Sequence, residues 1–147
     1  MKSKKWDDRF IGLAKLVGSW SKDPSTQVGA VIVDEDHRII SIGFNGLPRN
    51  VDDHYDRLNN RDIKYETVVH AEANALMFAN RSAKNCTLYT WPFQPCSRCA
   101  GLIIQSGMIK EVVTIQNNDP RWEKNFNLAV QMFDEAGIIL EWVKDGQ

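Results

Sequence analysis

The fold is decided by residues 87–107, which read TLYTWPFQPCSRCAGLIIQSG. The β-branched start predicts a strand over residues 87–90, which the prolines that follow bring to an end. A helix is predicted over residues 96–106, because a proline lies near its start, where a missing N–H costs nothing, and a glycine closes it. Cys96 and Cys99 lie three residues apart on one face of its first turn. The segment therefore predicts a strand followed by a helix that begins with two thiols.

On both sides of this segment, hydrophobic periodicity predicts further helices and strands. The helices are expected over residues 6–20, 69–79 and 125–136, and the strands over residues 28–33, 39–44, 111–115 and 138–142. A polar link between the first two strands makes them a β-hairpin. Residues 47–66 carry few periodic signals and are expected to form a long, functional loop. This order predicts one α/β domain over residues 1–147, with a mixed sheet of about five strands flanked by helices.

The composition is that of an ordinary globular protein, with 43% hydrophobic and 25% charged residues. The net charge of -1 argues against a strongly basic surface, so no nucleic-acid partner is expected. No secretory signal is visible, because the polar residues 6–9 follow the basic start, and no apolar run approaches the ~18 residues of a membrane span. Three cysteines are better interpreted as thiols or metal ligands than as disulfides. We therefore expect no membrane partner and a cytoplasmic location, in the host cytoplasm if the source is viral.

A metal site can be assembled from two short motifs, His-Ala-Glu at residues 70–72 and Pro-Cys-Ser-Arg-Cys at residues 95–99. A catalytic zinc site has three protein ligands and keeps its fourth position for water. His70, Cys96 and Cys99 supply three ligands of the types that Zn²⁺ prefers. The positive end of a helix dipole favours thiolate over thiol at such positions. Together the motifs form the H-x-E…P-C-x-x-C pattern of zinc-dependent nucleobase deaminases.

The charge balance of this site calls for a proton carrier. Zn²⁺ with two thiolates and a neutral imidazole has no net charge, so it should acidify water less than an all-histidine site. Glu72 lies two residues from His70 and points in a different direction, so it need not compete for the metal. We expect Glu72 to take a proton from the attacking water and deliver it to N3 of a cytosine-type ring, while the water oxygen adds to C4. Glu72 then helps to protonate the amine, which leaves as ammonia.

Two other interpretations of the cysteines stay open. A structural zinc site would normally have four protein ligands, and Cys86 could be the fourth. Because Cys86 enters a predicted strand with no second ligand type beside it, we expect an ordinary buried thiol there. A zinc-stabilised nucleotide-binding module without catalysis would also use the three ligands, but it would not need Glu72.

Four segments resemble the cytidine and deoxycytidylate deaminase superfamily, and most closely its deoxycytidylate deaminases. They are residues 21–30 (SKDPSTQVGA), 43–48 (GFNGLP), 70–75 (HAEANA) and 95–100 (PCSRCA). The last two carry the zinc motifs of the whole superfamily, whereas tRNA adenosine deaminases generally lack the first two. The resemblance implies a cytidine-deaminase-like three-layer fold and the hydrolysis of dCMP to dUMP and ammonia. Deamination of another base, such as adenosine in tRNA, is the alternative within the enzyme class.

The resemblance also implies a set of substrate-binding residues, which are Asn45, Ala71, Ser25, Thr26, Trp91 and Arg121. Asn45 would hydrogen-bond the deoxyribose, and the backbone of Ala71 with the strand end near Trp91 would contact the edge of the base. The two hydroxyl residues would meet the phosphate, and Arg121 would clamp it, because guanidinium forks suit phosphate. Simpler interpretations exist: a turn at residues 45–46, turn or cap chemistry at the hydroxyls, core packing for the tryptophan and an exposed surface arginine.

Regulation is the last property that the resemblance implies. Such enzymes commonly form homohexamers that dCTP activates and dTTP inhibits. The effector would bind at Lys22, Phe44, Asn45, Gly46, Arg49 and Arg57, with Mg²⁺ balancing the triphosphate charge. The basic members of this set could equally be solvated surface charges. Because the segment before the His-Ala-Glu motif contains His54 but no cysteine, one catalytic Zn²⁺ and no second, structural zinc is expected.

Overall fold

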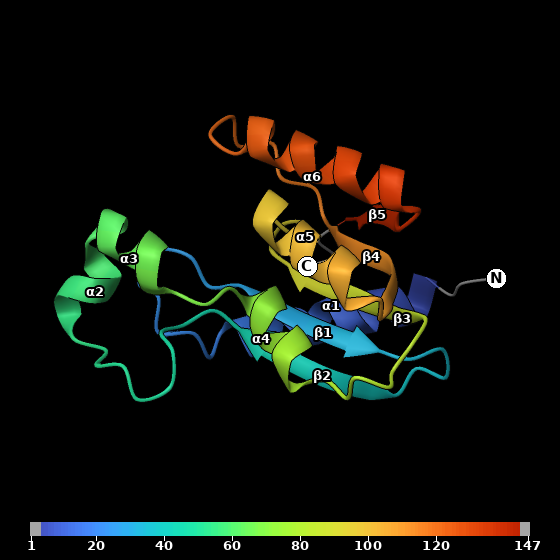
Figure 1. Ribbon diagram of the computed structural model, residues 1–147, viewed down its shortest axis with the longest axis horizontal. Helices are drawn as coiled ribbons and strands as arrows, with labels where there is room; N and C mark the ends of the chain where they lie inside the picture. The colour runs from blue at the N-terminus through green and yellow to red at the C-terminus, as the bar shows by residue number, and fades with distance from the viewer. Residues whose placement is uncertain (1–3, 145–147) are drawn as a thin grey trace.

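One sheet forms the centre of the molecule, with its strands in the order β2-β1-β3-β4-β5 (Figure 1). The computed structural model describes residues 4–144. The strands are β1 (Gly29–Val33), β2 (Ile39–Phe44), β3 (Cys86–Trp91), β4 (Ile109–Ile115) and β5 (Ile139–Val143). The helices are α1 (Lys4–Gly18), α2 (Tyr55–Asn59), α3 (Arg61–Thr67), α4 (Ala71–Phe78), α5 (Ser97–Ser106) and α6 (Glu123–Ala136). Among the described residues, no helix is both long and apolar enough to cross a membrane.

The sheet is mixed because its two halves are connected in different ways. β1 and β2 form the expected antiparallel hairpin, and β1 also pairs antiparallel with β3. β3, β4 and β5 run parallel, because α5 and α6 carry the chain back between them. The expectation of a mixed sheet of about five strands flanked by helices is therefore confirmed.

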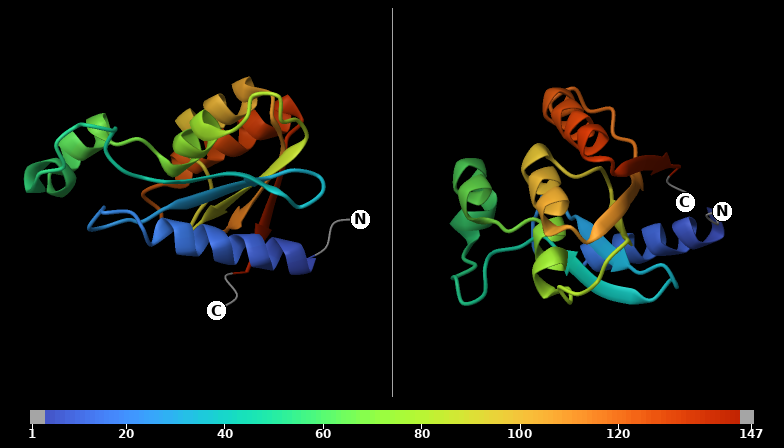
Figure 2. Two further views of the ribbon diagram at one scale, coloured as in Figure 1. Left: turned by 90° about the horizontal axis from the view of Figure 1, so that it is seen from below. Right: turned by 45° about the vertical axis from the view of Figure 1, so that its right-hand side comes forward.

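Helices cover both faces of the sheet, which gives three layers (Figure 2). α1 packs on one face, where Phe10, Val31 and Tyr89 belong to one buried cluster. α4, α5 and α6 lie on the other face, over a second cluster that includes Leu88 and Phe133. The three-layer α/β arrangement expected from the family resemblance is therefore present.

The first turn of α4 is fixed against the end of β2. A Cβ on Gly43 would lie 2.5 Å from both the carbonyl oxygen of Ala71 and the backbone nitrogen of Ala75, so only glycine permits this approach. The hydroxyl of Ser41 donates to the carbonyl oxygen of Ala75 at 2.7 Å. Nδ2 of Asn74 donates to the carbonyl oxygen of β2's last residue at 2.8 Å. These contacts hold the start of α4 in place, where two of the expected functional residues lie.

The prediction of a long loop over residues 47–66 is wrong, because this segment contains α2 and α3. The two helices lie beyond one end of the sheet (Figure 1). Asn60 caps α3, since its side chain accepts hydrogen bonds from the backbone N–H groups of Asp62 and Ile63. Neither helix buries an apolar side chain. Helices this short, without an apolar face, leave no hydrophobic period in the sequence.

The expected end of the second strand at residues 45–46 is confirmed, because β2 ends at Phe44, but the chain does not form a simple turn there. Instead the backbone N–H of Gly46 donates to the carbonyl oxygen of Val69 at 3.1 Å, and the N–H of Val69 donates back at 2.7 Å. This bridge leads the chain directly into the His-Ala-Glu motif. The other predicted elements are present, with ends that differ from the prediction by at most two residues.

Candidate metal centre and active site

Three metal-ligating side chains converge at the N-terminal ends of α4 and α5. His70 is the N-cap of α4, Cys96 is the N-cap of α5, and Cys99 lies in the first turn of α5. Nδ1 of His70 lies 3.6 Å from Sγ of Cys96 and 3.3 Å from Sγ of Cys99. The three ligand atoms all lie within 4.8 Å of one another. The fold thus brings together the three residues that the sequence pattern singles out.

These distances fit a tetrahedral zinc ion. With Zn–S bonds of about 2.3 Å and Zn–N bonds of about 2.0–2.1 Å, tetrahedral angles place sulfur and nitrogen about 3.6 Å apart. Three protein ligands leave one position for water or substrate, as in a catalytic site. Within residues 4–144 no fourth ligand joins the group. Cys86 is fully buried at the start of β3, with its Sγ 3.6 Å from the carbonyl oxygen of Lys84, so the expectation of an ordinary buried thiol is confirmed.

The protein environment already favours one thiolate. A hydrogen bond from the Cys99 thiol, opposed by burial and aided by His70 and the backbone N–H of Cys99, lowers the pKa of Cys96 to about 4. The same contact, with burial, raises the pKa of Cys99. A hydrogen bond to Cys96 raises the pKa of His70 in spite of burial. A bound dication would replace the shared proton and hold both sulfurs as thiolates.

Glu72 is buried beside the ligands without being one of them. It is the second residue of α4, only 4% exposed. Burial, followed by the negative charge of Cys96, raises its pKa to about 7. A carboxyl group with a pKa near neutrality can both accept and return a proton, which is the property expected of this residue. A bound dication would oppose this rise by stabilising the carboxylate.

The start of α5 is braced from α6. Oδ1 of Asn125 accepts a hydrogen bond from the backbone N–H of Ser97 at 2.9 Å, and its Nδ2 donates to Oγ of Ser97 at 3.0 Å. Gln94, buried just before the Cys-x-x-Cys motif, donates to the carbonyl oxygen of Phe126 at 3.1 Å. The orientation of the two thiols therefore depends on a helix more than 25 residues away. The sequence pattern pointed to neither Asn125 nor Gln94, because amides of this kind are common on surfaces.

Asn45 holds the loop that leads into β1. Its Oδ1 accepts a hydrogen bond from the backbone N–H of Val28 at 2.9 Å, and its Nδ2 donates to the carbonyl oxygen of Thr26 at 2.9 Å. Nδ2 also lies 3.4 Å from Oδ2 of Asp23. The residue is 7% exposed. Its expected contact with the deoxyribose stays a prediction, alongside this structural role.

Ser25 and Thr26 belong to a turn around Asp23. Their backbone N–H groups donate to Oδ1 of Asp23 at 2.9 and 3.1 Å. A pocket of about 500 Å³ opens beside this turn and is lined by Asp23, Pro24, Ser25, Thr26, Gln27, Trp91 and Pro92. Its size lies within the range of about 300–1,000 Å³ of small-molecule sites. The two hydroxyl residues therefore line a space that could hold a ligand.

Trp91 and Arg121 have other contacts. The ring of Trp91 packs against the buried cluster under α1, with Nζ of Lys15 5.3 Å from its centre. The guanidinium of Arg121 forms an exposed pair with Asp119 at 2.8 Å. The backbone of Ala71 lies at the start of α4, between His70 and Glu72. These contacts leave the expected roles toward base and phosphate as predictions.

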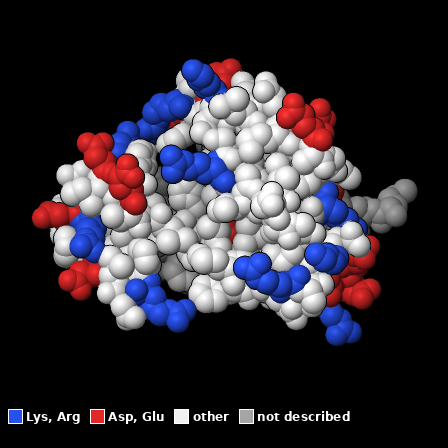
Figure 3. Space-filling model, viewed as in Figure 1, with Lys and Arg blue, Asp and Glu red and all other residues white. Residues whose placement is uncertain are grey.

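Five of the six expected effector residues lie within residues 44–57, and the sixth, Lys22, contacts this segment. Nζ of Lys22 lies 2.6 Å from Oδ2 of Asp53, and Arg57 donates to the carbonyl oxygen of Asp52 at 3.3 Å. Arg49 lies 5.7 Å from the ring centre of Phe78. Phe44 meets Trp20 edge to face, whereas Gly46 forms the bridge described above. Basic and acidic side chains are interspersed around a largely uncharged centre on the face in Figure 3.

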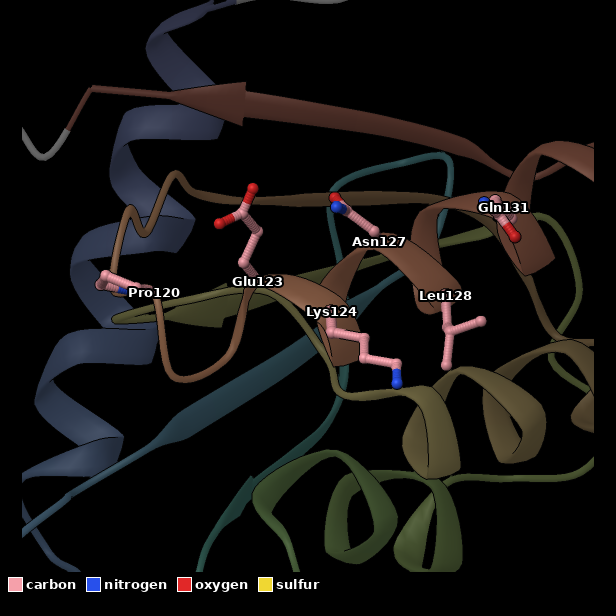
Figure 4. Close-up of a pocket in the computed structure, with 6 residues that line it drawn as sticks. All are labelled: Pro120, Glu123, Lys124, Asn127, Leu128 and Gln131. Carbon is pink, nitrogen blue, oxygen red and sulfur yellow. The ribbon is translucent and has the colours of Figure 1, made fainter.

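A second pocket, of about 430 Å³, lies along α6 (Figure 4). It is lined by Pro120, Glu123, Lys124, Asn127, Leu128 and Gln131. None of these residues is a candidate ligand or proton carrier of the metal centre. Within residues 4–144, the candidate metal ligands and the candidate proton carrier lie instead at the starts of α4 and α5.

Comparison with known proteins agrees with this geometry. A family model described as the zinc-binding region of cytidine and deoxycytidylate deaminases matches residues 4–116. The chain is 46% identical over 141 residues to a deaminase from the luxG 3′ region of Aliivibrio fischeri, covering 95% of this chain and 94% of that protein. It is 44% identical over 142 residues to the deoxycytidylate deaminase of Homo sapiens, covering 90% and 76% respectively. The dCMP deaminase of the cyanophage S-TIM5, solved with dCMP and dUMP, shares the fold with a TM-score of 0.75 at 23% identity, over 97% of this chain and 100% of that one.

Proposed function

This chain belongs to the cytidine and deoxycytidylate deaminase family, and on that premise we propose that it is an enzyme that hydrolyses dCMP to dUMP and ammonia. The observation that carries the proposal is the convergence of His70, Cys96 and Cys99 beside the buried carboxyl of Glu72. The name of the human relative supports dCMP as the substrate. A module that only bound nucleotides would have no use for a buried carboxyl group at this place, because burying it costs free energy.

His70, Cys96 and Cys99 would hold one zinc ion. When bound, the ion supplies Lewis-acid activation of a water molecule. The two cysteines lie at the positive end of α5, and as thiolates they would balance the charge of the ion. The hydrogen bonds between Ser97 and Asn125 hold that end of the helix in place.

Glu72 would move two protons in sequence. Its carboxylate takes a proton from the attacking water and delivers it to N3 of cytosine, while the water oxygen forms a bond to C4. Glu72 then helps to transfer the remaining proton of the new C4 hydroxyl to the 4-amino group, the C4–N bond breaks as the C4 carbonyl forms, and ammonia leaves. Because the same residue is base and then acid, a pKa near neutrality suits both steps.

Substrate would be held by Asn45 at the deoxyribose, by the backbone of Ala71 and the strand end at Trp91 at the base, and by Ser25, Thr26 and Arg121 at the phosphate. The pocket beside Asp23 supports the placement of the phosphate near the two hydroxyl residues. Residues 1–147 would act as one catalytic domain.

Regulation by dCTP and dTTP, with Mg²⁺ on the effector, belongs to the same proposal. Its site would be formed by Lys22, Phe44, Asn45, Gly46, Arg49 and Arg57, in a homohexamer. The contacts that Lys22 and Arg57 make with residues 52–53 support a shared site for these two residues. We place the enzyme in the cytoplasm, where its nucleotide substrate would be found.

The decisive experiment is ammonia release from dCMP by the purified protein, whose zinc content is measured first. We expect turnover of dCMP, a rise with dCTP and a fall with dTTP. A zinc-loaded protein that releases no ammonia from dCMP would contradict the assignment. Turnover that ignores both triphosphates would contradict the regulatory part alone.

A further inference from the structure

Lys64 is buried in a network that links α3 to the loop before β1. Lysine is almost never fully buried unless it is paired, yet Lys64 is only 8% exposed. Its Nζ lies 3.3 Å from Oδ1 of Asp23 and donates to Oγ of Ser25 at 2.8 Å. The pair spans 41 positions of the chain and connects α3, which lies beyond the sheet in Figure 1, to the loop that leads into β1.

Asp23 brings a negative charge to the wall of the pocket beside Ser25 and Thr26. It is 6% exposed, and burial by itself would raise its pKa. The backbone N–H groups of Ser25 and Thr26, together with the Lys64 ammonium, outweigh burial and lower that pKa. Asp23 is therefore a carboxylate at neutral pH. Such a charge would repel a phosphate group that entered the pocket.

We propose that Lys64 is a positioning residue for phosphate recognition: it neutralises Asp23 and holds the Ser25 hydroxyl as a donor toward the 5′-phosphate of the substrate. This inference rests on the proposed function, which places the phosphate beside Ser25 and Thr26. Through Lys64, α3 would contribute to the higher affinity for nucleotides than for nucleosides.

The chemistry of the three groups explains how Lys64 orients Ser25. An ammonium group only donates hydrogen bonds, so the Ser25 oxygen must accept from Lys64. The Ser25 hydroxyl proton is then directed elsewhere, and it donates to Oδ1 of Asp23 at 3.1 Å. When a phosphate enters, this proton can turn to a phosphate oxygen while Lys64 keeps Asp23 neutralised. Without Lys64, the hydroxyl would face an uncompensated carboxylate and the incoming anion at once.

The test compares equilibrium binding of dCMP and of deoxycytidine, which lacks the phosphate, by calorimetry on zinc-loaded proteins that all carry Glu72→Gln, so that dCMP is not hydrolysed during the titration. Turnover is measured separately on the same variants with Glu72 in place. We expect Lys64→Met to weaken dCMP binding by roughly tenfold or more at low salt, as expected for one unpaired charge near the ligand. Deoxycytidine binding should change less than about twofold, and kcat for dCMP should stay close to that of the unsubstituted protein. Lys64→Arg should keep most of the preference for dCMP, because it keeps the charge.

The double variant Lys64→Met/Asp23→Asn separates charge from structure, because it removes both members of the pair. We expect it to regain most of the dCMP affinity. Lys110→Met is the matched control: it removes an equal charge from an exposed pair with Glu35 at 3.4 Å, and it should leave both affinities unchanged. Thermal melts of every variant establish that the proteins compared are folded.

Two results would overturn the inference. One is an unchanged dCMP affinity in Lys64→Met, and the other is an equal loss for dCMP and deoxycytidine, which is the signature of a merely structural role. Because binding is measured separately from turnover, a protein that prefers dCMP through Lys64 but releases no ammonia would refute the proposed function and still support the role of Lys64.

Discussion

Replacing Glu72 with glutamine tests two effects of its buried carboxyl group, which are proton transfer during catalysis and a loss of stability when the group is ionised. The substitution keeps the shape of the side chain and removes its ability to carry a proton. General acid–base catalysis by one residue contributes about 10²–10⁴-fold to a rate. Because Glu72 is assigned both the base step and the acid step, we expect Glu72→Gln to lower kcat for dCMP by at least about 10³-fold, with the zinc content unchanged.

The same change should stabilise the metal-free protein at alkaline pH. Burial, together with the negative charge of Cys96, raises the pKa of Glu72 from 4.5 to about 7, which corresponds to about 3 kcal/mol of destabilisation once the group is ionised. The folded protein holds this proton more tightly than the unfolded chain does. The metal-free protein therefore loses stability as the pH rises from about 4.5 to about 7, and loses no more above that range. In Glu72→Gln this loss is absent, so its melting temperature at pH 8 should be higher by on the order of 10 °C.

The assay pairs ammonia release from the zinc-loaded proteins with thermal melts of chelated proteins at pH 4.5 and pH 8. Glu135→Gln is a matched control, because it removes an exposed carboxyl group on α6, and it should change neither activity nor the pH dependence of stability. A zinc-loaded Glu72→Gln protein with full activity would refute the assigned proton transfer. A variant that melts at the same temperature as the unsubstituted protein at pH 8 would show that Glu72 is not held in a desolvated position.

Other substitutions test the parts that surround this carboxyl group. Cys99→Ser should lower bound zinc from about one ion per chain to a small fraction, measured by atomic absorption, whereas Cys86→Ser should keep the zinc and all activity. Gly43→Ala should destabilise the protein by about 1–3 kcal/mol and lower kcat, since its Cβ would push α4 away from β2; a denaturant melt equal to that of the unsubstituted protein would contradict the packing described. Tyr89→Phe should cost about 1–2 kcal/mol of unfolding free energy in urea melts with activity retained, because the Tyr89 hydroxyl donates to Asp7 at 2.7 Å inside the α1 layer.

The metal ligands and the proton carrier could be predicted from the sequence because their chemistry is local. Cys96 and Cys99 share a helical turn, and His70 and Glu72 share another, so three-residue and two-residue spacings already limit how these side chains are oriented. The strands and the longer helices were predictable for the same reason, since helical spacing, short β-branched runs and nearby breaking residues are all local signals. Only the tertiary structure shows that the His-Ala-Glu and Cys-x-x-Cys motifs lie side by side.

The prediction of a long loop over residues 47–66 failed, and the bridge at Gly46 was not predicted, because the sequence carries no local signal for either feature. Asn45 and Gly46 have the composition of a turn, but the backbone of Gly46 pairs with Val69, which lies 23 positions further along. α2 and α3 bury no apolar side chain, so no periodicity marks them.

The sequence by itself predicted the α/β class, the three candidate ligands and the candidate proton carrier, since each follows from residue type and near spacing. The tertiary structure decided that Glu72 is desolvated, that α6 braces the ligand helix, and that Lys64 neutralises Asp23. Burial and charge pairing depend on which distant segments come into contact. A lysine in a polar stretch is therefore indistinguishable from a solvated surface charge until the fold places a buried carboxylate beside it.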